Sequence, residues 1–312
     1  MSSNEPVSES VALSPRVGEL VRLICERNPP HTKHLDSVLP RITAEEFEHL
    51  DRYLDFCIGR DLTLEYLAES YLLLVADAVN ELIHFATHGN YRYSTFEEVA
   101  DLVYFNDEYM SRYMHGLAIS LIFWTSHRET HRFFDQVLPR ERKGRYLEIG
   151  PGHGTFLMTA MRESSYTEFS GIDISETSIA QTRAILDHYI PEPERQCSLI
   201  VQDFFASDLQ PASFDAIVMG EVLEHVEEPR AFLRKIHELA RDDAFIFITT
   251  CVNAPQIDHI YLFRTLDEVA DMLNSEGFAI SRVKPIPYEG KTLDQCVAEQ
   301  LPINVAYVLA KR

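Results

Sequence analysis

Hydrophobic side chains recur at helical spacing over long stretches of the first half of the chain. In residues 61–88 the apolar positions lie three or four residues apart and form one continuous face: Leu64, Leu67, Tyr71, Leu74, Ala78, Leu82 and Phe85. This periodicity predicts an amphipathic helix, and Gly89 is a natural end for it. A similar spacing, with Met110, Met114, Leu117 and Leu121 inward, predicts a second helix over residues 107–134.

Helix-start signals extend this helical character over the whole first half. Two T/S-x-x-E capping boxes, Thr43 with Glu46 and Ser94 with Glu97, each precede an amphipathic run. We therefore predict an all-helical N-terminal domain over residues 13–140, behind a disordered tail over residues 1–12. We expect this domain to cover the substrate as a lid and to offer a dimerisation surface.

After residue 140 the pattern changes to short apolar runs that alternate with helical segments. The runs predict strands over residues 146–149, 168–172, 198–202, 214–220, 245–250, 279–284 and 304–309. Helices are predicted over residues 154–163, 176–189, 229–240 and 266–275, the last opened by a third capping box, Thr265 with Glu268. Such alternation is typical of a doubly wound, mostly parallel sheet, so residues 141–312 are predicted to form an α/β domain of seven strands.

Composition and charge narrow the range of partners. The chain has 49 acidic and 28 basic residues, a formal net charge of -21, which disfavours a nucleic-acid substrate. No apolar run reaches the roughly 18–20 residues that span a bilayer, and the first ten residues do not resemble a secretory signal. The five cysteines form no C-x-x-C pair, which fits a reducing compartment. We therefore expect a cytoplasmic protein with no membrane or nucleic-acid partner.

A glycine-rich loop follows the first predicted strand. Its sequence is E-x-G-x-G-x-G, with Glu148 two residues before Gly150 and with Gly152 and Gly154 after it. Glycine is required where the backbone turns sharply and a ligand approaches it closely. Thr155 stands where a dinucleotide fingerprint has its third glycine. An acidic residue at Glu148 would repel a pyrophosphate but suits a ligand that carries an ammonium or a sulfonium group.

Acidic residues also stand at the ends of the next three strands. Asp173, followed by Ile174, ends the second strand and can accept hydrogen bonds from both hydroxyls of a ribose. Asp203 can accept a hydrogen bond from an adenine amino group, and Phe204 can lie beside the base. Glu221 follows the fourth strand. Because ligands of open α/β sheets bind at the carboxyl ends of strands, we expect all of these side chains to meet in one crevice.

The segments LEIGPGHG, GIDIS, VQDF and FDAIVMGEVLEHV resemble the ordered motifs of class I S-adenosylmethionine-dependent methyltransferases, in particular those that modify small molecules. The resemblance covers about residues 145–252, and the last two strands would form that family's antiparallel hairpin. It implies that the three glycines border the methionine part of the cofactor, Asp173 the ribose, and Asp203 and Phe204 the adenine. Glu221 would lie near the methionine or the methyl group. The implied activity is methyl transfer from S-adenosylmethionine to an O, N or C atom of a small molecule.

Candidate residues for the acceptor come first from the loop after the fifth strand. His259 is our candidate general base, with Tyr261 beside it to orient the substrate and Asn253 as a substrate ligand. Glu221 and His225 are further catalytic candidates. Two structural interpretations compete with these roles: His259 caps the following helix, and His225 only supports the fold.

A second candidate segment lies on the helix that leads to the sheet. Tyr109 and Tyr113 are four residues apart there and His115 follows two residues later, and tyrosine faces attract a sulfonium through their quadrupole. The competing interpretation is core packing, which is typical of aromatic stripes on helices.

No metal site is predicted. His127 and His131 are four residues apart, but Arg128 stands where the metalloprotease pattern has its glutamate. Asp258 and His259 could take part in a metal site, although no further ligand can be assigned.

Three alternative functions stay open: a protein methyltransferase, a dinucleotide-dependent oxidoreductase, and a methyltransferase-fold module that only binds a partner. The fourth strand is followed by Gly220-Glu221-Val222 rather than an Asn-Pro-Pro-Tyr-like segment. This difference counts against enzymes that methylate nucleic-acid bases.

Overall fold

Seven strands form one mixed sheet at the centre of the computed structural model, which describes residues 13–190 and 196–312. Their order is β3-β2-β1-β4-β5-β7-β6, and β7 runs antiparallel to both of its neighbours. The strands are β1 Arg145–Ile149, β2 Glu168–Asp173, β3 Gln196–Val201, β4 Phe214–Met219, β5 Ala240–Val252, β6 Phe278–Pro287 and β7 Ile303–Lys311. The predicted seven-stranded doubly wound sheet is confirmed.

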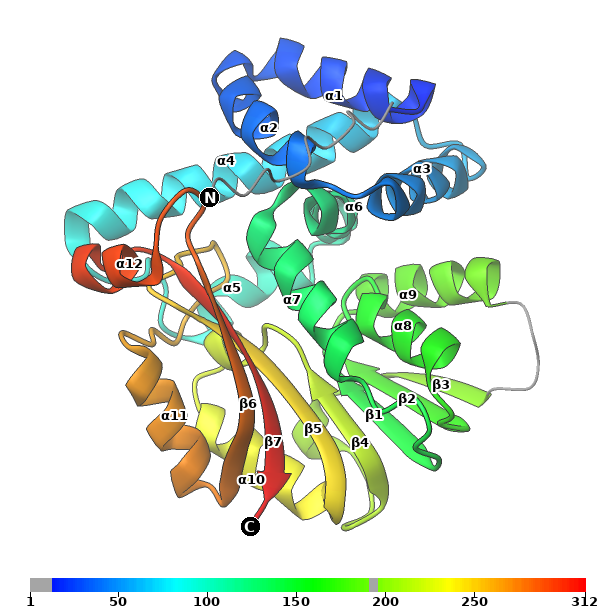
Figure 1. Ribbon diagram of the computed structural model, residues 1–312, viewed down its shortest axis with the longest axis vertical. Helices are drawn as coiled ribbons and strands as arrows, with labels where there is room; N and C mark the ends of the chain where they lie inside the picture. The colour runs from blue at the N-terminus through cyan, green and yellow to red at the C-terminus, as the bar shows by residue number, and fades with distance from the viewer. Residues whose placement is uncertain (1–12, 191–195) are drawn as a thin grey trace, which may run out of the picture.

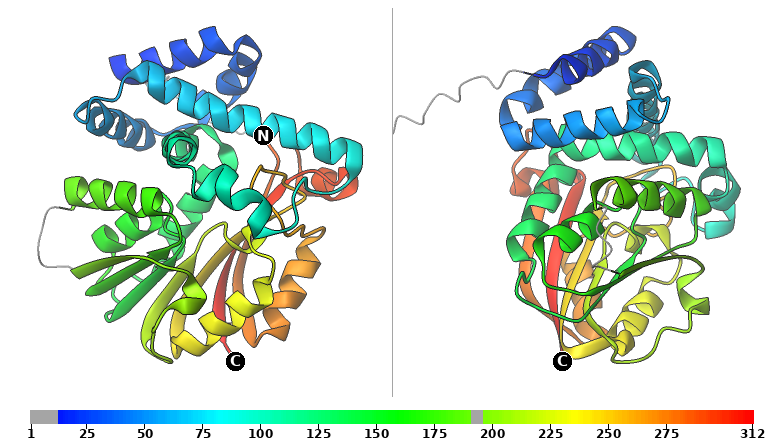
Figure 2. Two further views of the ribbon diagram at one scale, coloured as in Figure 1. Left: turned by 180° about the vertical axis from the view of Figure 1, so that it is seen from behind. Right: turned by 90° about the vertical axis from the view of Figure 1, so that its right-hand side faces the viewer.

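The segment before β1 is helical, as predicted, and most of it lies above the carboxyl ends of the parallel strands (Figure 1). Figure 2 shows the same cap from behind and from the side. Its helices are α1 Pro15–Arg27, α2 Thr32–Val38, α3 Ala44–Ile58, α4 Leu64–His88, α5 Phe96–Val99, the π-turn η3 Ala100–Tyr104, α6 Asp107–Phe123 and α7 Thr125–Val137. The predicted caps at Thr43 and Gly89 are confirmed: Thr43 forms a capping box with Glu46, and left-handed Gly89 ends α4. The predicted tail, residues 1–12, lies outside the described residues.

Two predictions in this region are wrong. The continuous helix over residues 107–134 is broken at Trp124, whose backbone is extended (φ -103°, ψ 125°). The Trp124 indole donates a hydrogen bond to Tyr71 (3.1 Å). The break lets α7 leave the helical cap and pack against the sheet, where it touches β6 and β7. The second capping box also lies one residue later than predicted, at Thr95 with Glu98.

Helices cover both faces of the sheet and create two hydrophobic cores. On one face, α7, α8 Thr155–Glu163 and α9 Glu176–Tyr189 pack on the sheet; on the other face lie α10 Pro229–Leu239 and α11 Leu266–Ser275. A further helix, α12 Leu293–Glu299, was not predicted. The first core continues into the helical cap, because the same cluster contains Leu20 of α1 and Phe247 of β5. The helical region and the sheet are thus packed together, while a domain boundary near residue 140 stays a prediction.

Among the described residues, none of the helices is both long and apolar enough to cross a bilayer.

Candidate active site

A cavity of about 880 Å³ lies between the carboxyl ends of the strands and the helical cap. Its size falls within the range of about 300–1,000 Å³ that is usual for small-molecule sites. The floor comes from the loops after β1, β2, β3, β4 and β5, and the roof comes mainly from α4 and α6. The cavity therefore joins the strand-end crevice predicted from the sequence to the helical region.

The glycine loop after β1 lets a ligand approach the backbone. Gly150 and Gly152 both line the cavity and have left-handed backbones, with φ of 64° and 55°. A Cβ on Gly150 would lie 2.8 Å from the Val222 side chain. At Gly152 the nearest atom to such a Cβ belongs to Met114, 4.0 Å away across the cavity. Gly154 caps α8 and packs against Thr182 instead, so it shapes the loop without lining the cavity.

The predicted nucleoside ligands Asp173, Ile174, Asp203 and Phe204 all line the cavity. The Asp173 carboxylate accepts hydrogen bonds from the Ser175 amide (2.9 Å) and from the Ser178 hydroxyl (3.1 Å). Burial raises the pKa of Asp173. Asp203 accepts a hydrogen bond from the Phe205 amide (2.7 Å).

Glu148, predicted to face the ligand, does not line the cavity. Strand alternation turns its side chain to the sheet face of α8 and α9, where it accepts a hydrogen bond from the Tyr146 hydroxyl at 2.7 Å. The side chain is 1% exposed, and this burial raises its pKa to about 8. The prediction that four acidic side chains converge is therefore wrong for Glu148.

Two carboxyl groups that follow β4 are buried close together. Glu221 has a left-handed backbone (φ 50°) and accepts a hydrogen bond from the Asn304 side chain (3.0 Å). Glu224 is fully buried and accepts one from the Thr250 hydroxyl (2.7 Å). In both, Oε1 has no hydrogen-bond partner among the described residues. Burial and the neighbouring Glu224 raise the pKa of Glu221 well above its ordinary value.

His225 forms a buried ion pair with Asp258. Its Nδ1 lies 3.2 Å from the Asp258 carboxylate, and the Tyr104 hydroxyl donates to the same carboxylate (3.1 Å). Burial would lower the pKa of His225, but the Asp258 charge outweighs it and raises the pKa to about 9. Burial would likewise raise the pKa of Asp258, and the His225 cation lowers it to about 2.

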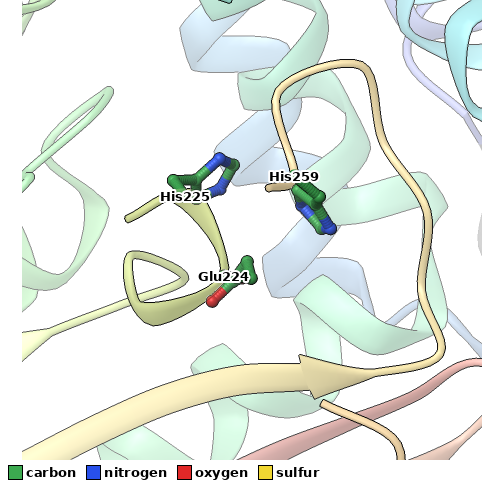
Figure 3. A group of neighbouring side chains, drawn as sticks. All are labelled: Glu224, His225 and His259. Atoms are coloured by element: carbon green, nitrogen blue, oxygen red, sulfur yellow. The ribbon is translucent and has the colours of Figure 1, made fainter. Parts of the chain in front are cut away.

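His259 lines the cavity beside this pair, with its ring centroid 4.6 Å from that of His225 and the two rings perpendicular. Figure 3 shows that His225 and Glu224 come from one turn after β4, whereas His259 comes from the loop after β5. The His259 Nδ1 donates to the Ala254 carbonyl (2.6 Å). Burial lowers the pKa of His259 to about 4. Its Nε2 has no hydrogen-bond partner in the described part of the chain.

Tyr113 lines the cavity, whereas the other acceptor candidates on α6 do not. Tyr109 donates its hydroxyl hydrogen bond to Asp77 (2.6 Å). His115 lies on another face of the helix, where its Nδ1 bonds to the Tyr53 hydroxyl (2.8 Å) in the core of the cap. The helical turn thus separates residues that we predicted to act together.

In the loop after β5, two further candidates lie outside the cavity lining. The Asn253 side chain donates to the Arg264 carbonyl (3.1 Å) and so closes the loop on itself. Tyr261 packs against Phe263, with ring centroids 4.7 Å apart. Both residues support the loop that presents His259, and neither faces the acceptor space.

The roof of the cavity is the part that sequence reasoning missed. It is mostly apolar and includes Leu74, Ala78, Leu82, Leu117, Leu121 and Trp124. No lysine or arginine is present among the described residues that line the cavity. The apolar spacing of residues 61–88 was visible in the sequence, but spacing alone does not tell a core-facing helix from one that roofs a cavity.

Comparison with known proteins supports the sequence resemblance. Residues 147–246 match the family model described as a methyltransferase domain. The ubiquinone biosynthesis O-methyltransferase of Neisseria meningitidis serogroup C is 31% identical over 117 residues, 37% of this chain and 47% of that protein. The enzyme of that name from Pseudomonas aeruginosa strain LESB58 is 31% identical over 121 residues, 38% of this chain and 48% of that protein. The chain thus spans about half the length of the curated relatives it matches.

A solved structure matches a larger share of this chain than these relatives do. Haemonchus contortus phosphoethanolamine N-methyltransferase 2, in complex with S-adenosyl-L-methionine, covers 70% of this chain. The match covers 60% of that chain with a TM-score of 0.51 and 13% identity. With the glycine loop and the strand order, these matches show that residues 147–246 form a methyltransferase domain and that the sheet has the fold of an S-adenosylmethionine-binding methyltransferase.

Proposed function

We propose that the protein transfers a methyl group from S-adenosylmethionine to a hydroxyl of an apolar small molecule that carries no phosphate or carboxylate. One observation carries this proposal: a single cavity is lined by the glycine loop and Asp173 and also by an apolar chamber at α4 and α6, with no lysine or arginine among the described lining residues.

The strand-end residues fit the methyl donor. Gly150 and Gly152 leave the backbone open beside the loop, where the methionine part would lie. Asp173 would accept hydrogen bonds from the ribose hydroxyls, and Phe204 would contact the adenine. When bound, S-adenosylmethionine supplies an activated methyl group on a sulfonium. The cation suits a cavity wall that carries Glu221 and, among the residues that the structure describes, no lysine or arginine.

The chamber favours a neutral, apolar acceptor. Burying a phosphate or carboxylate requires a paired charge or several hydrogen-bond donors. The His225 cation in this wall is already paired with Asp258, and the wall also carries acidic side chains such as Glu227 and Glu289. Apolar contact with Leu74, Leu117 and Trp124 would supply most of the binding energy. The O-methyltransferase names of the relatives favour a hydroxyl over an amine as the acceptor.

The protein's own contribution would be to orient the acceptor, exclude water and help remove its proton. His259 is the predicted catalytic residue at the acceptor, because Nδ1 is held by the Ala254 carbonyl and Nε2 stays available at the cavity. Tyr104 and Asp258 would act as positioning residues, because they fix the neighbouring His225. We also propose that residues 13–140 act as the lid and specificity domain. A homodimer and a cytoplasmic location stay predictions.

Ligand binding followed by a matched pair of substitutions tests this function. We expect S-adenosylmethionine and S-adenosylhomocysteine to raise the thermal unfolding temperature, and NAD(P) to have no effect. A screen of apolar phenols and alcohols should reveal acceptors through release of S-adenosylhomocysteine. Ala78→Phe places a ring in the chamber and should raise the acceptor KM at least tenfold without changing donor affinity.

Ile83→Phe is the control, because Ile83 lies on the same helix but is 62% exposed and does not line the cavity. Stabilisation by NAD(P) alone, or a preference for phosphorylated acceptors, would contradict the proposal.

A further inference from the structure

Beyond the methyl-donor site, the cavity wall contains a compact group of side chains that can act as metal ligands. Glu224, His225 and His259 each offer one ligand atom, and these atoms all lie within 4.8 Å of one another. Glu221, Glu224 and Cys251 form a second such group, so Glu224 belongs to both. The first three residues surround one space in Figure 3. Ligand atoms at the usual metal distance of about 2.0–2.2 Å from one ion span at most about 4.4 Å, close to the spacing found here.

From this geometry we infer that Glu224, His225 and His259, with Glu221 beside them, bind one divalent transition-metal ion. Two imidazoles and carboxylate oxygens are ligands that suit ions such as Mn²⁺, Fe²⁺ and Zn²⁺. The methyl-transfer site does not require these residues to be grouped in this way. Metal binding is independent of the proposed function, whereas the metal's role in catalysis rests on it.

The surroundings of each ligand match those of metal-binding residues, which other groups usually orient. His225 Nδ1 faces Asp258 and His259 Nδ1 faces the Ala254 carbonyl, so each histidine can offer Nε2 to an ion, which at His225 would displace the Nε2 proton. The Thr250 hydroxyl donates a hydrogen bond to one carboxylate oxygen of Glu224, Oε2. Each side chain is thus held through one atom while another stays available.

Unpartnered carboxylate oxygens provide the second, independent observation. Glu224 is fully buried, yet its Oε1 has no hydrogen-bond partner among the described residues, and the same holds for Oε1 of Glu221. Buried acceptors without a donor are rare and call for an explanation. A dication between these two carboxylates would supply the missing partner and offset their mutual repulsion.

A metal ion at this wall would assist transfer to a hydroxyl. The acceptor oxygen would bind the ion, which lowers the pKa of the hydroxyl so that its proton passes to water. The oxygen lone pair then forms the C–O bond while the C–S bond of the sulfonium breaks, and sulfur keeps the bonding pair as a thioether. In this arrangement His259 would be a ligand and would no longer take the proton, so this role replaces the one proposed for His259 without a metal.

Metal binding can be measured without any acceptor. The full chain is stripped with a chelator, dialysed against Mn²⁺ or Zn²⁺, and assayed for bound metal by mass spectrometry and, for Mn²⁺, by loss of the free-ion electron paramagnetic resonance signal. We expect about one ion per chain. Glu224→Gln and His259→Asn should each weaken binding at least tenfold. Asp258→Asn, which alters the support of His225 and not a proposed ligand, should weaken it about 10–100-fold.

His127→Asn is the matched control, because His127 lines the same cavity but is not among the grouped ligands; its metal affinity should equal that of the wild type. Circular dichroism and thermal unfolding identify variants that fail to fold. If the ligand variants fail to fold, the metal affinity of Asp258→Asn decides whether the site exists. Binding below one-tenth of an ion per chain, or equal binding in all variants, would overturn the inference. The affinity for S-adenosylmethionine is measured in parallel to keep the two proposals separate. A protein that binds S-adenosylmethionine but binds no metal ion would refute only the metal site.

Discussion

The substitution Glu148→Gln distinguishes two roles of Glu148. The sequence suggested that its side chain faces the ligand, whereas in the structure it is buried away from the cavity. The carboxyl group is buried against Tyr146, whose hydroxyl donates to it at 2.7 Å. Glutamine has the same shape, keeps an oxygen to accept that hydrogen bond, and cannot ionise. The substitution therefore removes the ability of this side chain to ionise and changes little else.

The size of the effect follows from the pKa. Burial raises the pKa of Glu148 from 4.5 to about 8, and one pKa unit corresponds to about 1.4 kcal/mol. Ionising this carboxyl in the folded protein therefore costs on the order of 5 kcal/mol. Below pH 4.5 the group is protonated in both states and has no effect. As the pH rises towards 8, only the unfolded chain loses the proton, so the free energy of unfolding falls; above pH 8 the full cost is present.

Urea denaturation at pH 5 and pH 8.5 checks this reasoning. We expect Glu148→Gln to match the wild type within about 1 kcal/mol at pH 5 and to exceed it by about 3–5 kcal/mol at pH 8.5. Glu168→Gln, an exposed carboxyl on β2, is the control and should show no such divergence. S-adenosylmethionine affinity should change less than about threefold, because the side chain does not line the cavity. Parallel stability profiles for wild type and variant, or a large loss of donor affinity, would refute the assignment.

Two other substitutions test the site and the fold. Asp173→Ala should weaken S-adenosylmethionine binding by about 1–3 kcal/mol through lost charge-assisted hydrogen bonds, measured by calorimetry; unchanged affinity would remove the ribose assignment. Asp215→Ala should lower the free energy of unfolding by about 1–3 kcal/mol, because the Arg145 amide loses its acceptor (2.8 Å) at the start of β1. Asp243→Ala changes a carboxylate that is 82% exposed and pairs with Arg142; it should have an effect below about 0.5 kcal/mol, and equal losses for both variants would contradict the role of Asp215.

The donor half of the cavity could be predicted from the sequence because its signals are local. A glycine loop after a strand and single residues at strand ends keep their positions wherever strands run parallel. Gly150, Gly152, Asp173 and Asp203 therefore lie in one cavity, as expected. Glu148 and Gly154 do not line it. Gly154 packs against Thr182, and for Glu148 the face of the strand that meets the cavity depends on the twist and depth of the sheet around it.

Tertiary packing brings together the residues in the part of the cavity that we propose to hold the acceptor. His225 and His259 lie 34 positions apart in the chain, and no spacing rule brings them together; the turn after β4 and the loop after β5 do. The break at Trp124 likewise comes from contacts between helices, and periodicity cannot reveal it. The sequence by itself determined the sheet, the helical cap and the strand ends that we propose to hold the nucleoside, because backbone patterning sets them. Only the folded chain decided which side chains face the common cavity, because burial and hydrogen bonding between distant segments select them.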